Sequence, residues 1–149
     1  RRRMGRRREP MNPQRGQEGG SAFVYPITVG PDAIDELDHV NNAVYLTWVQ
    51  QAITAYWVAH APAEEVAKIA WIALRHDIRY RSEAFLGDQL EAKVLLRGFR
   101  GSRSQFEIQF SRGSVSVAEV DTTLCCIDRE TRQLHRITHE LARHFAIVA

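Results

Sequence analysis

The segment DELDHVNNAVYL, from Asp35 to Leu46, decides the fold, because a polar, acidic stretch here gives way to the one long helical pattern of the chain. Five apolar side chains recur after it at helical spacing, namely Tyr45, Val49, Ala52, Ile53 and Tyr56. Asn41 or Asn42 is predicted to cap the N-terminus of this helix, and Pro62 is predicted to end it.

The residue types just before this helix suit chemistry on an activated carbonyl. Carboxylates, an imidazole and two amides stand beside the unpaired N–H groups and the positive dipole end of the helix. Such N–H groups stabilise an oxyanion, and a carboxylate beside them can act as nucleophile or general base. The alternative is structural, with Asp35 and Asp38 as solvated loop acids and Asn41 as a cap.

Strand patterns flank the helix on both sides. Phe23–Val29 is rich in β-formers and predicts a first strand, while Ala63–Ile69 predicts a short helix or turn. Strict alternation then places five residues on one face of the next strand: Ile72, Leu74, His76, Ile78 and Tyr80. Three more strands are expected over residues 89–97, 104–111 and 115–127, with a loop over 98–103 and a short helix from Thr138 through Ala146. A strand, a long helix and a four-strand meander predict an α+β fold, with one antiparallel sheet curled against one helix.

Charge is distributed unevenly along the 149 residues. Residues 1–22 hold seven arginines and two glutamates, a charge of +5, while the other 127 residues hold 13 basic and 16 acidic side chains, a charge of −3. The segment 1–22 is poor in apolar groups and is predicted to be a disordered tail. A mildly acidic body argues against a domain whose whole surface binds nucleic acid. The body, residues 23–149, is expected to form one domain.

The sequence also bears on the compartment. No apolar run approaches the roughly 18 residues that span a bilayer, and no secretory signal follows the N-terminal arginines. Cys125 and Cys126 are adjacent, so in a strand they point to opposite faces and cannot readily bridge. Two buried thiols in a reducing compartment, the cytoplasm, is the simplest interpretation.

The pattern Asp-x-x-x-His-Val-Asn-Asn-x-x-Tyr over residues 35–45, followed by an apolar helix, resembles the hotdog-fold thioesterases. It is similar to the group of 4-hydroxybenzoyl-CoA thioesterase and its acyl-CoA relatives, and at His-Val-Asn-Asn to plant acyl-ACP thioesterases. Residues 75–80, the Gly-Asp turn in 84–88, and the pairs at 136–137 and 140–141 match weaker family features in the right order. The resemblance covers about residues 23–146 and implies a hotdog fold.

The resemblance implies roles for the residues at the helix entrance. Asp35 stands where the family keeps its catalytic carboxylate, as nucleophile or as general base for water. The backbone N–H of Asn42, helped by Ala43, would polarise the thioester carbonyl. His39 and Asn41 would line or orient that pocket. The family often has glycine before this histidine, and Asp38 stands there, so Asp38 is an alternative carboxylate.

Other candidate residues lie farther along the chain. By the resemblance, Tyr45 and Val49 would face the acyl group, and Arg100 and Arg103 would hold the CoA phosphates, for which a solvated hairpin tip is the alternative. His76 is either a substrate-pocket residue or a satisfied core histidine. No histidine has the spacing to a cysteine that a zinc site requires, so no metal is expected, and the reaction requires no cofactor.

The predicted function is hydrolysis of acyl-CoA or acyl-ACP thioesters, as in fatty acid metabolism, by a homodimer or tetramer whose open strand edges pair. One alternative is an acyl-CoA-binding or sensing hotdog module, which needs no carboxylate at Asp35. A 3-hydroxyacyl dehydratase is disfavoured because the His-Phe-Pro and Asp-x-Asn-Pro-x-His stretches of those enzymes are missing. A third alternative is nucleic-acid association through the arginine tail.

Overall fold

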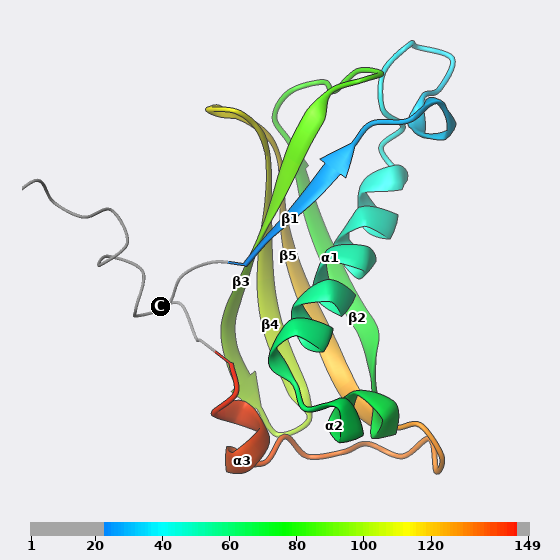
Figure 1. Cartoon of the computed structure of the whole chain (residues 1–149). Helices are drawn as coiled ribbons and strands as arrows, with labels where there is room; N and C mark the ends of the chain where they lie inside the picture. The colour runs from blue at the N-terminus through cyan, green and yellow to red at the C-terminus, as the bar shows by residue number, and fades with distance from the viewer. Residues whose placement is uncertain (1–22, 146–149) are drawn as a thin grey trace, which may run out of the picture.

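A computed structural model describes residues 23–145 (Figure 1). The predicted tail over 1–22 and the last predicted helical residue, Ala146, lie outside the described residues. The helices and strands, in chain order, are β1 (Phe23–Thr28), a 3-10 turn η1 (Pro31–Ala33), α1 (Val44–His60), α2 (Ala63–Lys68), β2 (Ile69–Tyr80), β3 (Gln89–Arg100), β4 (Arg103–Arg112), β5 (Val115–Asp128) and α3 (His139–Ala142).

The five strands form one antiparallel sheet in the order β1-β3-β4-β5-β2, and α1 lies along one face of it (Figure 1). The α+β hotdog prediction is therefore confirmed. The prediction of a four-strand meander is wrong, because only β3, β4 and β5 are joined as hairpin neighbours. Strand β2 instead pairs with β5, so β1 and β2 form the two edges.

The predicted single apolar face of β2 is also wrong. A register shift between Ala73 and Arg75 leaves Leu74 as an extra residue in this strand. The bulge exchanges the two faces, so Trp71 and Ala73 pack toward the helix before it and Ile78 after it. Ile72 and Leu74 are 46% and 48% exposed, and they lie on the outer face of the sheet.

Helix α1 buries the residues that the periodicity predicted. Tyr45, Val49, Ala52, Ile53 and Tyr56 are all buried, and Trp48 and Trp57 join them. Their partners are the alternate side chains of β3, β4 and β5 that face α1, among them Val94, Ile108 and Val120. The helix stops before Pro62, as expected, and Thr138 caps α3 by accepting from the Leu141 N–H at 3.2 Å.

The β3–β4 hairpin is longer than predicted. Both strands continue to Arg100 and Arg103, which pair directly, so the predicted loop over 98–103 shrinks to Gly101 and Ser102. Gly101 has φ = +64°, a conformation that glycine adopts without steric cost. The tight turn therefore holds the two arginines side by side at the end of the sheet.

Two further expectations concern β5 and membranes. Cys125 and Cys126 are buried and free, and they follow each other in β5 so that their side chains point to opposite faces. Burial raises the pKa of the Cys126 thiol to about 12. Within residues 23–145, no helix has the length and apolar character to cross a membrane.

Candidate active site

A tight turn gathers the candidate carboxylates and the imidazole in front of α1. Ile34 and Val40 form an isolated antiparallel bridge, and the Asp35 N–H donates to the His39 carbonyl at 3.1 Å. Asp38 closes the turn with φ = +61°, in the left-handed region where Asp is better tolerated than most residues. The turn therefore brings Asp35, Asp38 and His39 into one loop.

The Asp35 side chain is half-buried and fixed in orientation. Its Oδ1 accepts from the Leu37 N–H at 2.9 Å. No hydrogen bond within residues 23–145 is made by its Oδ2, so this oxygen is available to a water or a substrate. Asp38, by contrast, is exposed. His39 is half-buried, and its Nδ1 lies 3.0 Å from the Val40 carbonyl oxygen.

The helix entrance differs from the prediction in two respects: the N-cap residue is neither Asn41 nor Asn42, and the Ala43 N–H is not free. Ala43 is the N-cap residue, and the Asn41 Oδ1 accepts from the Ala43 N–H at 2.9 Å, so this N–H is already paired. The expectation that Ala43 helps to polarise a carbonyl is therefore wrong. The Asn42 N–H donates to no acceptor within the described residues, which leaves it as the candidate oxyanion donor.

Two segments that the sequence indicated only as family features, and not as parts of the site, support this entrance. Tyr80, at the end of β2, donates its hydroxyl to the Asn42 carbonyl at 2.9 Å. The Val40 N–H donates to the Ala84 carbonyl at 2.8 Å, just after β2. The segment around Ala84 leads into a turn in which Asp88 accepts from the Phe85 N–H and from Arg112. The contact between Tyr80 and Asn42 joins residues 38 positions apart, so no local sequence pattern could predict it.

A cavity of about 280 Å³ lies at this entrance. It joins three of the predicted site residues, His39, Asn42 and Tyr45, with residues from the end of β2 and the loop after it: Val40, Tyr80, Arg81, Ser82, Glu83 and Ala84. Asp35 and Asp38 are not among its lining residues, so the carboxylates stand beside this cavity and not in its wall.

Tyr45 forms the inner wall of the entrance cavity. Its ring makes edge-on contacts with Trp48, Tyr80 and Phe110, with centroid distances of 5.1 to 5.5 Å. Burial, and then the neighbouring Tyr80 hydroxyl, raise the pKa of Tyr45 to about 12. The phenol is therefore neutral at physiological pH, and Tyr45 acts here as an apolar wall.

A second cavity, of about 240 Å³, lies farther along α1, between this helix and β2. It contains the predicted residues Val49 and His76, together with Gln50, Ile53, Thr54, Trp57, Ala70, Trp71, Leu124 and Arg129. The His76 Nδ1 lies 2.8 Å from the buried Thr122 hydroxyl, and burial lowers the pKa of His76. His76 is therefore hydrogen-bonded and part of a cavity wall, and its burial favours the neutral imidazole.

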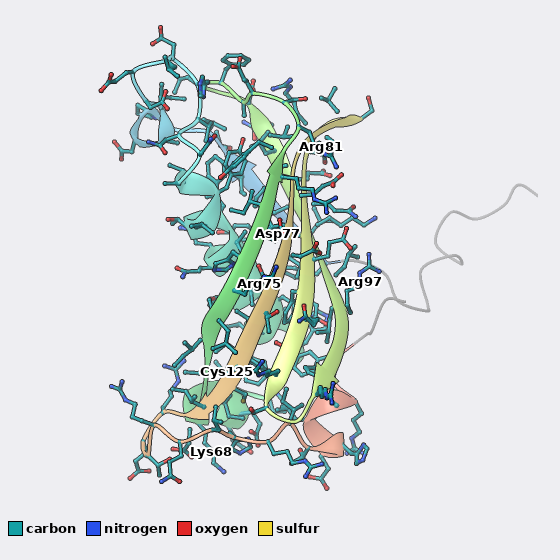
Figure 2. All side chains as sticks on the ribbon, turned by 180° about the vertical axis from the view of Figure 1, so that it is seen from behind. Lys68, Arg75, Asp77, Arg81, Arg97 and Cys125 are labelled. Carbon is teal, nitrogen blue, oxygen red and sulfur yellow. The ribbon has the colours of Figure 1, made fainter. Side chains whose placement is uncertain are left out.

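The third cavity is a groove of about 780 Å³ on the sheet face that points away from α1. It is lined by the predicted pair Arg100 and Arg103, by two further arginines, Arg75 and Arg97, and by Leu74, Gly98, Phe99, Gln105 and Thr123. Figure 2 shows Arg75 and Arg97 on this outer face. Arg97 forms an ion pair with Glu107. Because the four arginines come from three strands, sequence spacing alone indicated only two of them.

Within one protomer, the β3–β4 turn that carries Arg100 and Arg103 lies at the opposite end of the sheet from the start of α1 (Figure 1). Strand β3 begins at Gln89, which pairs with Thr28 near the entrance, and it ends at Arg100. Twelve residues of strand at roughly 3.3 Å each separate these ends by roughly 35 to 40 Å.

The sequence comparisons connect this geometry with a family. Residues 29–145 match the model of the thioesterase-like superfamily, and this match includes the turn, the helix entrance and all three cavities. The chain belongs to the thioesterase-like superfamily. It is a thioester hydrolase. The comparison with curated proteins gave no match.

Solved structures agree with this family. The probable thioesterase YbaW of Escherichia coli is 25% identical, with a TM-score of 0.68 over 81% of this chain and 94% of that chain. A Staphylococcus aureus protein in complex with CoA is 17% identical, with a TM-score of 0.75 over 85% and 82% of the two chains. A 1,4-dihydroxy-2-naphthoyl-CoA thioesterase from Synechocystis is 15% identical, with a TM-score of 0.70 over 83% and 95%. The last two likenesses show the shared fold.

A metal site was not expected in this thioesterase-like chain. Among the described residues, no group of three or more histidine, cysteine, aspartate or glutamate side chains is arranged to hold a metal ion.

Proposed function

We propose that this protein hydrolyses acyl-CoA thioesters to a free acid and CoA, with Asp35 as the catalytic carboxylate. The observation that carries the proposal is that two groups lie at the same helix entrance. They are the half-buried carboxylate of Asp35 and the backbone N–H of Asn42, which has no acceptor among the described residues. Hydrolysis of a thioester needs both elements, because a nucleophile must be activated and the negative charge on the carbonyl oxygen must be stabilised.

Asp35 supports two forms of the reaction. As a general base, its Oδ2 takes a proton from water while the water oxygen attacks the thioester carbon. As a nucleophile, the same oxygen attacks that carbon, expels the CoA thiolate and forms an anhydride, which water then hydrolyses. In both forms the thiolate leaves with the electron pair of the C–S bond and is protonated afterwards. The Leu37 N–H fixes the carboxylate orientation that either form requires.

The oxyanion is stabilised by the Asn42 N–H. The donor's own peptide is held by the Asn41 carbonyl, which accepts from the Val44 N–H, and the next peptide is held by Tyr80 and the Asn41 amide. A preorganised donor costs little reorganisation when charge develops, which is how such donors accelerate acyl transfer. His39 lines the same cavity and orients the substrate beside it.

The acyl group extends along α1 from this entrance. Tyr45 lines the first cavity and Val49 the second, one helical turn apart on the same helix face. Across the gap, Tyr80 and His76 occupy the corresponding positions of β2. We infer that an acyl chain occupies the space between α1 and β2 from the first cavity toward the second.

The arginine groove binds the phosphates of CoA. Arg100 and Arg103 are directly opposite each other across the hairpin, and like charges in this arrangement repel. Neither side chain forms an ion pair within the described residues, so a phosphate is a fitting counter-ion. A protein of the same fold from Staphylococcus aureus was solved in complex with CoA, which is the ligand proposed for this chain.

We further infer a homodimer through the β2 edge. Strand β2 has 12 residues and no neighbour on its outer side within one protomer, which leaves a long edge able to pair with a second copy. An antiparallel pair would place the arginine groove of one protomer nearer to the Asp35 loop of the other. Such a dimer explains how one substrate could contact both the arginine groove and the Asp35 loop, which lie far apart within one chain.

A thiol-release assay on a panel of acyl-CoAs and acyl carrier protein thioesters tests the proposal. Asp35→Ala is expected to lower kcat at least about 100-fold, the usual contribution of an acid–base group. Asp38→Ala and the control Asp32→Ala, an exposed acid of the preceding turn, should stay within a few-fold of the parent.

The other outcomes are distinct. Full activity in Asp35→Ala with loss in Asp38→Ala would move the catalytic role to Asp38. Tight binding of acyl-CoA without release of thiol from any substrate would favour the sensing module. Release only from carrier-protein thioesters would contradict CoA as the substrate.

A further inference from the structure

The outer face of β2 carries an acid and a base that the proposed reaction does not use. Asp77 and Arg79 are exposed and follow Arg75 at a period of two, so they lie with it on the sheet face that points away from α1. Figure 2 shows Arg75 and Asp77 on this face. Neither Asp77 nor Arg79 forms an ion pair within the described residues. Both charges therefore remain available to a strand that pairs with this open edge.

The neighbours of Asp77 within the sheet are acidic. Asp77 pairs directly with Asp121 of β5, and Asp121 pairs with Glu107 of β4, so three carboxylates form one row across the sheet. Like charges in directly opposed positions destabilise a sheet. Glu107 has an ion pair with Arg97, whereas Asp77 at the open end of the row has none. A cation supplied from beyond the edge would therefore stabilise this row.

The surroundings of Arg79 are complementary to those of Asp77. Arg79 pairs in the ladder with Glu119 of β5, but Glu119 forms its ion pair with Arg81, at 3.2 Å. Arg79 thus reaches the open edge without an ion pair of its own, two residues from Asp77. A second copy of β2 that runs antiparallel presents the same two charges in reverse order, so the acid of each copy can meet the base of the other.

The faces of β2 restrict the register of such a pair. Directly opposed residues of a ladder point to the same side of the sheet, so outer-face residues must meet outer-face residues. The bulge at Leu74 exchanges the faces, which confines matched pairing to the segment after it. A two-fold axis through His76 therefore matches only residues 75–77 before the two bulges interrupt the ladder, whereas an axis through Ile78 matches residues 75–81.

Charge separates the remaining registers. An axis through Asp77 opposes this carboxylate to its own copy, and an axis through Arg79 opposes two guanidinium groups. An axis through Tyr80 opposes Arg79 to the partner's Arg81. An axis through Ile78 opposes Asp77 to the partner's Arg79, and the symmetry makes this pair twice.

We propose that two copies of the chain pair along β2 with the two-fold axis at Ile78, in a register selected by two ion pairs between Asp77 and the partner's Arg79. The same register places Arg75, from the arginine groove, beside the partner's Arg81, from the wall of the entrance cavity. The groove of one copy thereby meets the entrance of the other, and a substrate phosphate between these two arginines offsets their repulsion. This inference rests on the proposed function, since it names the register of the dimer inferred there.

Charge exchange tests the register, with the dimer dissociation constant measured by analytical ultracentrifugation. Asp77→Arg and Arg79→Asp should each weaken the homodimer at least about tenfold, because each replaces two attractions by two repulsions. An equimolar mixture of the two variants should form heterodimers with an affinity close to that of the parent, since positions 77 and 79 then meet with opposite charges. This recovery also shows that both variants fold.

Arg75→Asp is the matched control, because it makes the same substitution on the same face of β2. In the proposed register it removes the repulsion with Arg81 and should not weaken the dimer, whereas in the register centred on His76 it would oppose Asp77. The proposal is overturned if Arg75→Asp weakens the dimer and Arg79→Asp does not. It is equally overturned if the mixture of Asp77→Arg and Arg79→Asp gives no heterodimer, or if neither single exchange changes the dissociation constant.

Disulfide trapping measures the register without relying on charge. Directly opposed residues of an antiparallel ladder have Cα atoms about 4.5 to 5.5 Å apart, within reach of a disulfide. Under a mild oxidant, a mixture of Asp77→Cys and Arg79→Cys should form a covalent dimer, and neither variant should form one alone. A mixture of Asp77→Cys and Arg75→Cys, which are opposed only when the axis passes through His76, should remain uncross-linked.

These measurements need no turnover, so they separate the register from the proposed activity. If positions 77 and 79 cross-link while no thioester is hydrolysed, only the proposed activity fails. If thiol is released by a parent protein that sediments as a monomer, or as a dimer that forms no cross-link between positions 77 and 79, the register is wrong and the activity stands.

Discussion

A residue at the helix entrance can be restricted by the backbone conformation of its position or by a role in the reaction, and Asp38 is an example of the first. The position requires φ = +61°, which glycine adopts freely, Asp tolerates, and a β-branched residue adopts only with strain. The resemblance to enzymes that often have glycine here thus has a conformational reason. Asp38 need not be catalytic for the position to be restrictive.

Substitutions at Asp38 should therefore follow backbone cost. Asp38→Gly is expected to keep the free energy of unfolding within about 0.5 kcal/mol of the parent, while Asp38→Val should lose about 1–2 kcal/mol. Urea denaturation followed by tryptophan fluorescence measures both. Equal stability of the two variants would show that the turn tolerates strain at this residue.

Tyr80 gives a second prediction at this scale. Tyr80→Phe removes the hydrogen bond to the Asn42 carbonyl and so loosens the peptide that directly follows the oxyanion donor, the Asn42 N–H. We expect kcat to fall about tenfold with little change in KM, and stability to fall by about 1 kcal/mol. Tyr25→Phe, the same substitution in β1, serves as the control. A change in KM alone would assign Tyr80 to substrate binding instead.

The sequence predicted some of these residues and not others for clear reasons. The local pattern from Asp35 to Tyr45 led to the turn and the helix entrance, because its residues are close both in sequence and in space. It did not reveal that the Asn41 side chain occupies the Ala43 N–H, since either amide fitted a capping role. Tyr80 and Trp57 were missed as site residues because their contacts depend on how β2 lies against α1.

At the scale of elements, the helix could be predicted more reliably than the sheet. Periodicity identifies a helix face within the segment itself, and all five predicted α1 positions are buried. Strand pairing is decided between segments, so the partnership of β2 with β5 had no local signal. The bulge at Leu74 exchanges the two faces of β2 midway along the strand. No sign of it is visible in the sequence, because Ile72, Leu74 and His76 continue an unbroken period of two.

The turn between Phe85 and Asp88, which supports the helix entrance, should make the free energy of unfolding depend on pH. The Phe85 N–H, and then Arg112, hold the pKa of Asp88 below its ordinary value by hydrogen-bonding its ionised form. A lowered folded pKa means that this stabilisation is present above the unfolded pKa of about 4 and is lost as the pH falls through the folded value.

Asp88→Asn should therefore be less stable than the parent by about 1 kcal/mol at neutral pH. The difference should vanish at about pH 2, where the parent carboxyl is protonated as well. Urea denaturation at a series of pH values measures it. A constant difference across this range would mean that Asp88 acts through packing and not through its charge.

At the scale of the whole molecule, the arginines proposed to bind CoA and the carboxylate proposed to act on the thioester lie far apart within one chain. The chain carries a net +2, but the body is acidic, and the arginines that line a groove are gathered at one end of the sheet. Asp35, the carboxylate that the proposed mechanism uses, lies in the loop before α1, at the other end. In the proposed dimer, joined along β2, one substrate would reach both places by contacting two copies of the chain.

Mixed dimers test this sharing. One subunit carries Asp35→Ala, and the other carries Arg100→Ala with Arg103→Ala, so each is weak as a homodimer. If a site takes its carboxylate from one subunit and its arginines from the partner, every mixed dimer contains one intact site. Random mixing of equal amounts should then restore about a quarter of the parent activity. If the arginines serve the carboxylate of their own subunit, neither site of a mixed dimer is intact, and thiol release should stay at the level of the separate variants.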